Sequence, residues 1–159
     1  MTRSYASLPQ MNMGFAGAKL AIITEGCVLT ILRDDKAGIA FPGYWDLPGG
    51  ARDGLENPVE CALRETREEL GLVLNDDLFS WGACFGSGDD RTWFFTMCAQ
   101  DGISEKVVFG DEGQRWEAMP MARFLAHEKA VPHFQRRLQQ SLDEILGQEK
   151  PPASWGGGR

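Results

Sequence analysis

The stretch that decides the fold is residues 50–72, GARDGLENPVECALRETREELGL. Asn57 can cap a helix, Pro58 suits its first turn, and Glu60 follows three residues after Asn57, as in a capping box. Small or apolar side chains recur at helical spacing along this segment: Val59, Ala62, Leu63, Thr66 and Leu70. The pattern predicts a helix that begins near Pro58, docks this stripe on a sheet and ends at a left-handed C-cap, Gly71.

The same helix carries three glutamates on one side. At about 100° per residue, Glu65, Glu68 and Glu69 fall within roughly a third of the circumference, beside the apolar stripe. Like charges at these spacings weaken a helix, so helix propensity does not explain the cluster. Carboxylate oxygens in this number suit Mg²⁺, with Mn²⁺ as the alternative, because these ions take a few protein ligands and leave other positions to water and substrate phosphates. A solvated acidic face is the competing interpretation that an isolated E-x-x-E-E pattern would favour.

The whole arrangement resembles the signature of the Nudix (MutT-like) hydrolases. The matching positions are Gly50, Glu56, Arg64, Glu65, Glu68, Glu69, Gly71 and Leu72, with Thr66 as the least typical residue. The resemblance implies an α/β fold, the Nudix-type α/β/α sandwich with a mixed β-sheet. It also implies Mg²⁺-dependent hydrolysis of a diphosphate bond.

By resemblance, the signature supplies both catalytic residues and metal ligands. The expected ligands are the carboxylates of Glu65, Glu68 and Glu69 and the carbonyl of Gly50. Arg64 is expected to pair with Glu56 and brace the loop against the helix, with contact to phosphate as its second potential role.

A further acidic loop lies downstream, at residues 111–114, DEGQ. It resembles the MutT-type loop that brings another carboxylate to the metals, and Glu112 is the candidate for that ligand, against the alternative of an ordinary acidic turn. The general base is expected to be Glu65 or Glu112. Arg33 and Arg52 are candidates for contact with substrate phosphate through charge-assisted hydrogen bonds, although a solvated arginine is the commoner outcome.

Outside the signature, apolar and β-branched runs predict strands, and one later segment predicts a second helix. The expected strands are 19–23, 27–33, 44–47, 78–85, 92–98 and 114–119, with a hairpin at Glu25-Gly26 and a sharp turn at residues 48–50. The expected helix is 131–146, with Phe134, Leu138, Leu142 and Ile145 on one side. The length suits one domain, which we assign to residues 17–147, between a partly ordered N-terminal segment, 1–16, and a disordered tail, 148–159.

The composition limits the classes of partner that we expect the protein to bind. The net charge of −7 opposes binding to a nucleic-acid polymer, which needs a basic face. The sequence has neither a long apolar run nor the apolar core of a signal peptide, so the expectation is a cytoplasmic protein without a membrane partner, as a monomer or homodimer. The cysteines, Cys27, Cys61, Cys84 and Cys98, lack C-x-x-C spacing and are expected to be reduced and mostly buried.

The expected partner is a small molecule, a nucleoside triphosphate or another nucleoside diphosphate derivative. Subfamily tags are absent: where ADP-ribose enzymes carry proline, this chain has Gly88. Two alternatives stay open. One is a catalytically weak Nudix-like domain that binds or senses a nucleotide, and the other is an isopentenyl diphosphate isomerase, whose additional cysteine and histidine metal-site features are not evident here.

Overall fold

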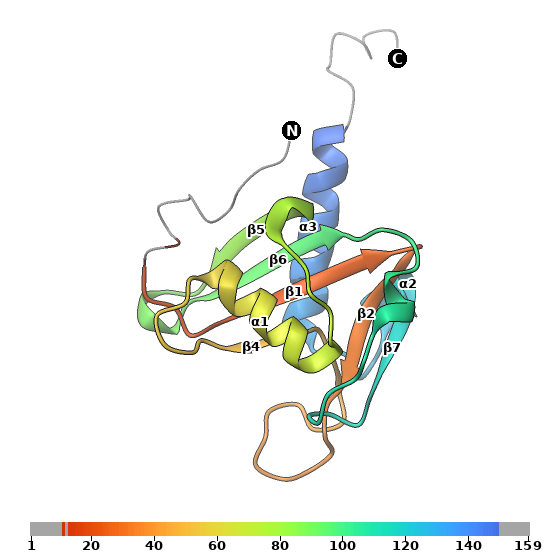
Figure 1. The fold of residues 1–159 in the computed structure, drawn as a ribbon, viewed down its shortest axis with the longest axis horizontal. Coiled ribbons are helices and arrows are strands. Elements are labelled where there is room, and N and C mark those ends of the chain that lie inside the picture. The colour runs from red at the N-terminus through yellow and green to blue at the C-terminus, as the bar shows by residue number, and fades with distance from the viewer. Residues whose placement is uncertain (1–10, 12, 150–159) are drawn as a thin grey trace, which may run out of the picture.

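A mixed sheet of seven strands lies between two helices in the computed structural model, which describes Met11 and residues 13–149 (Figure 1). At its centre, β1 (Gly17–Thr24) runs parallel to β6 (Thr92–Cys98) and antiparallel to β2 (Cys27–Leu32) and β4 (Gly49–Ala51). The predicted hairpin is confirmed, because Thr24 is paired with Cys27 across it.

The remaining strands extend the sheet on either side. β3 (Trp45–Asp46) and β7 (Arg115–Pro120) both pair with β2, and β5 (Phe79–Phe85) pairs with β6, all antiparallel. The resulting order is β3-β2-β1-β6-β5, with β4 beside β1 and β7 beside β2. Apart from β4, the strands agree with the predicted ones to within two residues at either end.

One helix covers each face of the sheet (Figure 1). α1 (Pro58–Leu70) lies in front of β1 in this view, α3 (Pro132–Glu149) lies behind it, and the short α2 (Met121–Ala126) follows β7. The predicted α/β/α sandwich is therefore confirmed, as is the C-terminal helix, whereas α2 was not predicted. Short 3₁₀ turns occupy the connections at Asp76–Leu78, Gly88–Asp90 and Ile103–Lys106.

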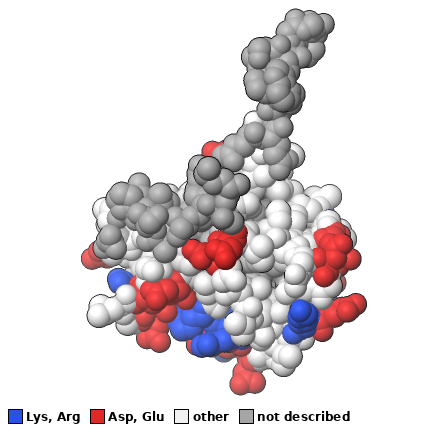
Figure 2. Space-filling model, turned by 45° about the horizontal axis from the view of Figure 1, so that its top comes forward, with Lys and Arg blue, Asp and Glu red and all other residues white. Residues whose placement is uncertain are grey.

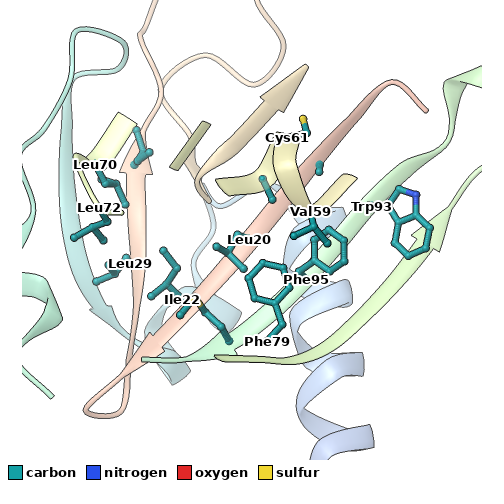
Figure 3. Close-up of a cluster of buried hydrophobic side chains, with 14 of the residues drawn as sticks. Leu20, Ile22, Leu29, Val59, Cys61, Leu70, Leu72, Phe79, Trp93 and Phe95 are labelled. Carbon is teal, nitrogen blue, oxygen red and sulfur yellow. The ribbon is translucent and has the colours of Figure 1, made fainter. Parts of the chain in front are cut away.

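The alternation of side chains along β1 divides the core in two. Ala18, Leu20 and Ile22 face α1, while Ala21 faces α3. Figure 3 shows the layer on the α1 side, in which the helix packs on the sheet. Its labelled residues are Leu20, Ile22, Leu29, Val59, Cys61, Leu70, Leu72, Phe79, Trp93 and Phe95. Burial of this apolar layer fixes the rotation of α1 and so decides which way its glutamates point.

At both ends, the folded structure extends beyond the expected domain limits of residues 17 and 147. Met11 and Phe15 are buried in the α1-side core, so part of the predicted 1–16 segment belongs to the folded domain. α3 continues to Glu149, two residues into the predicted tail. The rest of both predicted segments, residues 1–10, 12 and 150–159, lies outside the described residues.

Two predictions were wrong. Residues 49–51 form β4 instead of ending a sharp turn, because Gly49 and Gly50 lie directly against β1: a Cβ on Gly49 would come 2.2 Å from the Ala18 carbonyl oxygen. Glycine thus permits a strand pairing that larger residues would block. The cysteines are all free, as expected, but of these four only Cys61 is buried, and Cys98 is exposed.

Charges are mixed on the face that Figure 2 shows, where basic side chains lie between acidic ones. Among the described helices, none is both long and apolar enough to span a membrane.

Candidate active site

Both ends of α1 are fixed by the caps that its sequence predicts. The Asn57 Oδ1 accepts a hydrogen bond from the Glu60 amide at 2.8 Å, and the Glu60 carboxylate accepts one from the Asn57 amide at 2.9 Å. At the other end, Gly71 adopts φ 67° and its amide donates to the Arg67 carbonyl. These caps set the helical register that places the glutamates of the last turns.

Three glutamates of α1 meet the predicted acidic loop around one cavity of about 240 Å³. Its lining consists of Glu65, Glu68, Glu69, Asp111 and Glu112. The loop is held there by the free end of the helix, because the amides of Val108 and Gly110 donate to the carbonyls of Leu70 and Glu69 at 2.8 and 2.9 Å. These bonds satisfy helix-end carbonyls and bring the loop carboxylates beside those of the helix.

Glu69 is the least solvated of the helix carboxylates. Its Oε1 accepts a 2.7 Å hydrogen bond from the amide of Gly49 in β4. Burial raises the pKa of Glu69 to about 7, although Lys19 and the Gly49 amide both favour the ionised form. Burial therefore makes this carboxyl costly to ionise in the absence of a bound cation.

Glu65 and Glu68 share one cation. Arg64 Nη1 lies 3.1 Å from Oε1 of Glu65 and 3.0 Å from Oε2 of Glu68. Burial raises the pKa of Glu65, and the neighbouring Arg64 opposes that rise. Glu68 is the more exposed of the two, with 53% of its side chain accessible.

In the described part of the chain, no three His, Cys, Asp or Glu side chains are already arranged closely enough to enclose a metal ion. Glu65 and Glu68 instead contact Arg64, and Glu69 contacts the Gly49 amide. The donor set itself suits a hard divalent cation, since the residues that line the cavity are all carboxylates.

The predicted brace between Glu56 and Arg64 is present. Arg64 Nε and Nη2 each donate to a different Glu56 carboxylate oxygen at 2.9 Å, and Nη2 also donates to the Ala51 carbonyl. The hydrogen bonds from Arg64 hold the pKa of Glu56 below its usual range. Arg64 is not among the residues that line the carboxylate cavity, but its contacts with Glu65 and Glu68 place it directly beside that cavity.

The two arginines predicted to contact phosphate lie in different surroundings. Arg33 lines a second cavity of about 190 Å³, which shares Glu69 and Glu112 with the first. Its Nη1 donates to Asp46 Oδ2 at 2.8 Å and its Nε to the Ala40 carbonyl at 2.8 Å. Arg52 instead lies over the Phe15 ring, 4.7 Å from its centroid, and lines neither cavity.

The Gly50 carbonyl, the remaining predicted ligand, accepts a 3.5 Å contact from the Cys61 thiol and does not line the carboxylate cavity. A Cβ on Gly50 would lie 2.8 Å from the Glu65 carboxyl carbon, so this glycine leaves room for that carboxylate. Gly50 therefore lies beside Glu65 but is not one of the residues that line the carboxylate cavity.

Sequence reasoning missed a buried charge network beside the site. Asp46, 5% exposed, accepts from Lys19 Nζ at 3.1 Å and from Arg33, and Lys19 also donates to the carbonyls of Leu47 and Gly49. A lone lysine in an apolar strand and an aspartate flanked by buried residues were the available signals, because buried charges are normally paired.

Comparison with known proteins agrees with this geometry. A family model described as NUDIX domain matches residues 18–141. The chain is 38% identical over 64 residues to a Mycobacterium tuberculosis protein named "Putative 8-oxo-dGTP diphosphatase 3", over 37% of this chain and 29% of that one. It is 42% identical over 50 residues to RNA pyrophosphohydrolase of Gluconacetobacter diazotrophicus, over 30% of each chain.

The matched segments thus span under a third of the length of these curated relatives. Among solved structures, the MutT protein from Methanosarcina mazei Go1 superposes with a TM-score of 0.63 at 19% identity, covering 91% of this chain and all of that one. At this identity the structural match concerns the fold.

Proposed function

This chain belongs to the NUDIX family, and from that membership we propose that it is a metal-dependent pyrophosphohydrolase. Its substrate would be a nucleoside triphosphate or another nucleoside diphosphate derivative. The observation that carries the proposal is the convergence of Glu65, Glu68, Glu69 and Glu112 on one cavity. Carboxylates gathered from a helix and a distant loop are what a diphosphate hydrolase needs to hold divalent cations.

In this proposal the four glutamates hold Mg²⁺ or Mn²⁺. When bound, the ion would neutralise charge on the phosphates and make a water molecule more acidic. Arg64 keeps Glu65 and Glu68 from repelling each other, and Gly49 fixes one oxygen of Glu69. The rest of the reaction then depends on groups of the chain itself.

The proposed chemical step is attack of water on a phosphorus of the diphosphate. A new P–O bond forms to the water oxygen, the bridging P–O bond breaks, and the bridging oxygen leaves on the second phosphate. Glu65 or Glu112 takes the proton of the water, because both line the cavity in which the attack would occur. Arg33, held by Asp46, is placed to bind a phosphate oxygen in the adjoining cavity.

The names of two relatives refer to different substrates. The name of one refers to a modified nucleoside triphosphate and the name of the other to RNA. The alternative of a catalytically weak sensing domain is disfavoured, because the signature glutamates are all retained and line one cavity. The net charge of −7 favours small nucleotides over an RNA chain.

A phosphate-release screen with Mg²⁺ tests the proposal. The panel comprises canonical and 8-oxo nucleoside triphosphates, nucleotide sugars, ADP-ribose, dinucleoside polyphosphates and a 5′-triphosphorylated RNA. We expect turnover of at least one nucleotide, loss of that turnover in excess chelator, and a fall in kcat of about 100-fold or more in Glu65→Gln and Glu69→Gln.

Glu128→Gln is the matched control, because Glu128 is an exposed glutamate that does not line the carboxylate cavity. It should keep the parent rate. Hydrolysis in ¹⁸O water should label a phosphate-containing product. Nucleotide binding without turnover across the panel, or label on a sugar or base alone, would contradict the proposal.

A further inference from the structure

A third cavity, of about 360 Å³, lies on the α3 side of the sheet. Its floor is made of the first residues of β1 and of β4, including Gly17 and Gly50, and its wall is made of His133, Phe134 and Arg137 of α3. The volume is typical of sites for small organic ligands, which combine apolar walls with a few polar groups.

The cavity is basic in an acidic protein. Lys19 and Arg137 line it, and none of its lining residues is an aspartate or glutamate. Lys19 is already satisfied, since its ammonium donates to Asp46 and to two backbone carbonyls. The excess positive charge therefore belongs to Arg137.

The Arg137 side chain makes few polar contacts. Its Nη1 makes a 3.4 Å hydrogen bond to the Thr92 hydroxyl, and its guanidinium lies over the Phe85 ring, 4.2 Å from the centroid, and 5.8 Å from that of Phe134. Among the described residues it has no carboxylate partner, in contrast to Arg33, Arg64 and Arg123. Burial, and then the charge of Arg136, lower the pKa of Arg137.

A guanidinium donates hydrogen bonds and cannot accept them, so its ligand must present acceptor atoms. The remaining surroundings favour a flat ring, because the aromatic side chains of His133 and Phe134 line the wall and the small residues of the floor leave room for close approach. A ring that carries a carbonyl oxygen combines both features.

The cavity adjoins the proposed catalytic site through β4. Gly50 lines the cavity, and a Cβ on Gly50 would touch the Glu65 carboxylate. The amide of the preceding Gly49 donates to Glu69. Gly50 thus lies between the cavity and Glu65, and in the arrangement proposed next the base occupies the cavity and the phosphates lie at the carboxylates.

We propose that this cavity binds the base of the substrate and that Arg137 is a specificity-determining residue, selecting bases with a carbonyl group over bases with an amino group. The inference rests on the proposed nucleotide hydrolysis. Guanine, hypoxanthine and uracil offer a carbonyl oxygen at the position where adenine and cytosine carry an amino donor. An amino group facing Arg137 would place one hydrogen-bond donor against another and leave both without an acceptor.

Matched nucleotide pairs test the selection. ITP carries a carbonyl oxygen at the ring position where ATP carries an amino group, and dUTP and dCTP differ in the same way. We expect kcat/KM with Mg²⁺ to favour ITP over ATP and dUTP over dCTP by about tenfold or more. Arg137→Met should bring both ratios close to one. Arg137→Gln, whose amide both donates and accepts, should shift the first ratio toward ATP.

Arg136→Met is the control, because Arg136 is the neighbouring arginine on α3 and is exposed. It should preserve both ratios, and melting temperatures will show that each variant is folded. Calorimetric Kd values for IMP and AMP give a readout independent of turnover. IMP should bind more tightly to the parent, and Arg137→Met should remove the difference.

The outcomes separate this inference from the proposed function. If no nucleotide is hydrolysed, the proposed function fails while the IMP and AMP affinities still decide the role of the cavity. Equal kcat/KM values within each pair, or equal Kd values for IMP and AMP, would overturn the inference. So would an Arg137→Met variant that weakens all four triphosphates equally, since Arg137 would then contact the shared sugar or phosphate.

Discussion

Arg64 and Glu56 form a two-point ion pair in which both carboxylate oxygens of the glutamate are 2.9 Å from an arginine nitrogen. The Arg64 and Glu56 side chains are only 20% and 12% exposed. The amide of Asp53 donates to Glu56 and Arg64 donates to the Ala51 carbonyl, so the pair joins the loop before α1 to the helix itself. Paired hydrogen bonds of this kind are among the stronger polar contacts in proteins.

Glu56→Gln should lower the free energy of unfolding at pH 7 by about 1–3 kcal/mol, because it removes the two-point carboxylate partner of a partly buried guanidinium. The hydrogen bonds from Arg64 lower the pKa of Glu56, so this stabilisation is present above the ordinary value of 4.5 and is lost as the pH falls through the folded-state pKa. Urea unfolding at several pH values should therefore show the difference between parent and variant shrinking in acid. Glu117→Gln, which breaks the more exposed pair with Arg123, should cost less than about 1 kcal/mol.

Glu112→Gln should lower kcat more than Asp111→Asn does. Both residues line the carboxylate cavity, but Glu112 also lines the cavity that contains Arg33, so its carboxylate is at the junction where metal and phosphate would meet. Steady-state kinetics with the nucleotide found in the screen, at saturating Mg²⁺, measure the difference. Equal and mild effects of the two substitutions would show that the loop is an ordinary acidic turn.

Gly50→Ala should reduce turnover more than it reduces stability. The added Cβ would lie 2.8–2.9 Å from the carboxyl atoms of Glu65 and would displace that side chain, and misplacement of a catalytic group by about 1 Å can cost about 100-fold in rate. Comparison of kcat with the melting temperature separates the two effects. Gly147→Ala in α3 has open space around its Cβ and should keep the parent rate. A Gly50→Ala variant with normal kcat would show that Glu65 tolerates displacement.

Local signals made α1 predictable. Its caps, Asn57 with Glu60 and Gly71, lie within a few residues of the ends that they fix, and its apolar stripe has a clear period. The pairing of Glu56 with Arg64 and the position of Glu112 followed from resemblance to a family, since both depend on contacts across a loop. The ion pair is present, and Glu112 lines the same cavity as the signature glutamates, while its part in metal binding stays a prediction.

Long-range contacts could not be predicted in the same way. β4 was missed because Gly49 and Gly50 read as a turn, while their pairing with β1 depends on how closely two backbones approach. The sequence also marks Lys19 as a lysine in an apolar strand without showing that Asp46 is its partner. Likewise, the placement of Arg52 over Phe15 depends on where an N-terminal residue enters the core.

The hydrogen bond from Gly49 to Glu69 does not offset the burial of that carboxylate, whose pKa is raised from 4.5 to about 7. The folded protein therefore binds more protons than the unfolded chain between these values. Without metal, its stability should fall as the pH rises from about 4.5, and the loss should be complete somewhat above pH 7, with a total on the order of 3 kcal/mol.

Glu69→Gln should abolish this loss, because glutamine keeps an oxygen for the Gly49 amide and carries no charge. In chelator, the variant should melt higher than the parent at pH 8 and at a similar temperature at pH 4.5, while Glu128→Gln should follow the parent at both.

Mg²⁺ binds the ionised carboxylates and stabilises the folded state in proportion to RT ln(1 + [L]/Kd), so it should raise the parent's melting temperature more at pH 7.5 than at pH 5. That increase should be smaller in Glu69→Gln. A variant that responds to Mg²⁺ as the parent does would show that Glu69 is not a metal ligand, and one that melts lower than the parent in chelator at pH 8 would show that its carboxylate stabilises the fold.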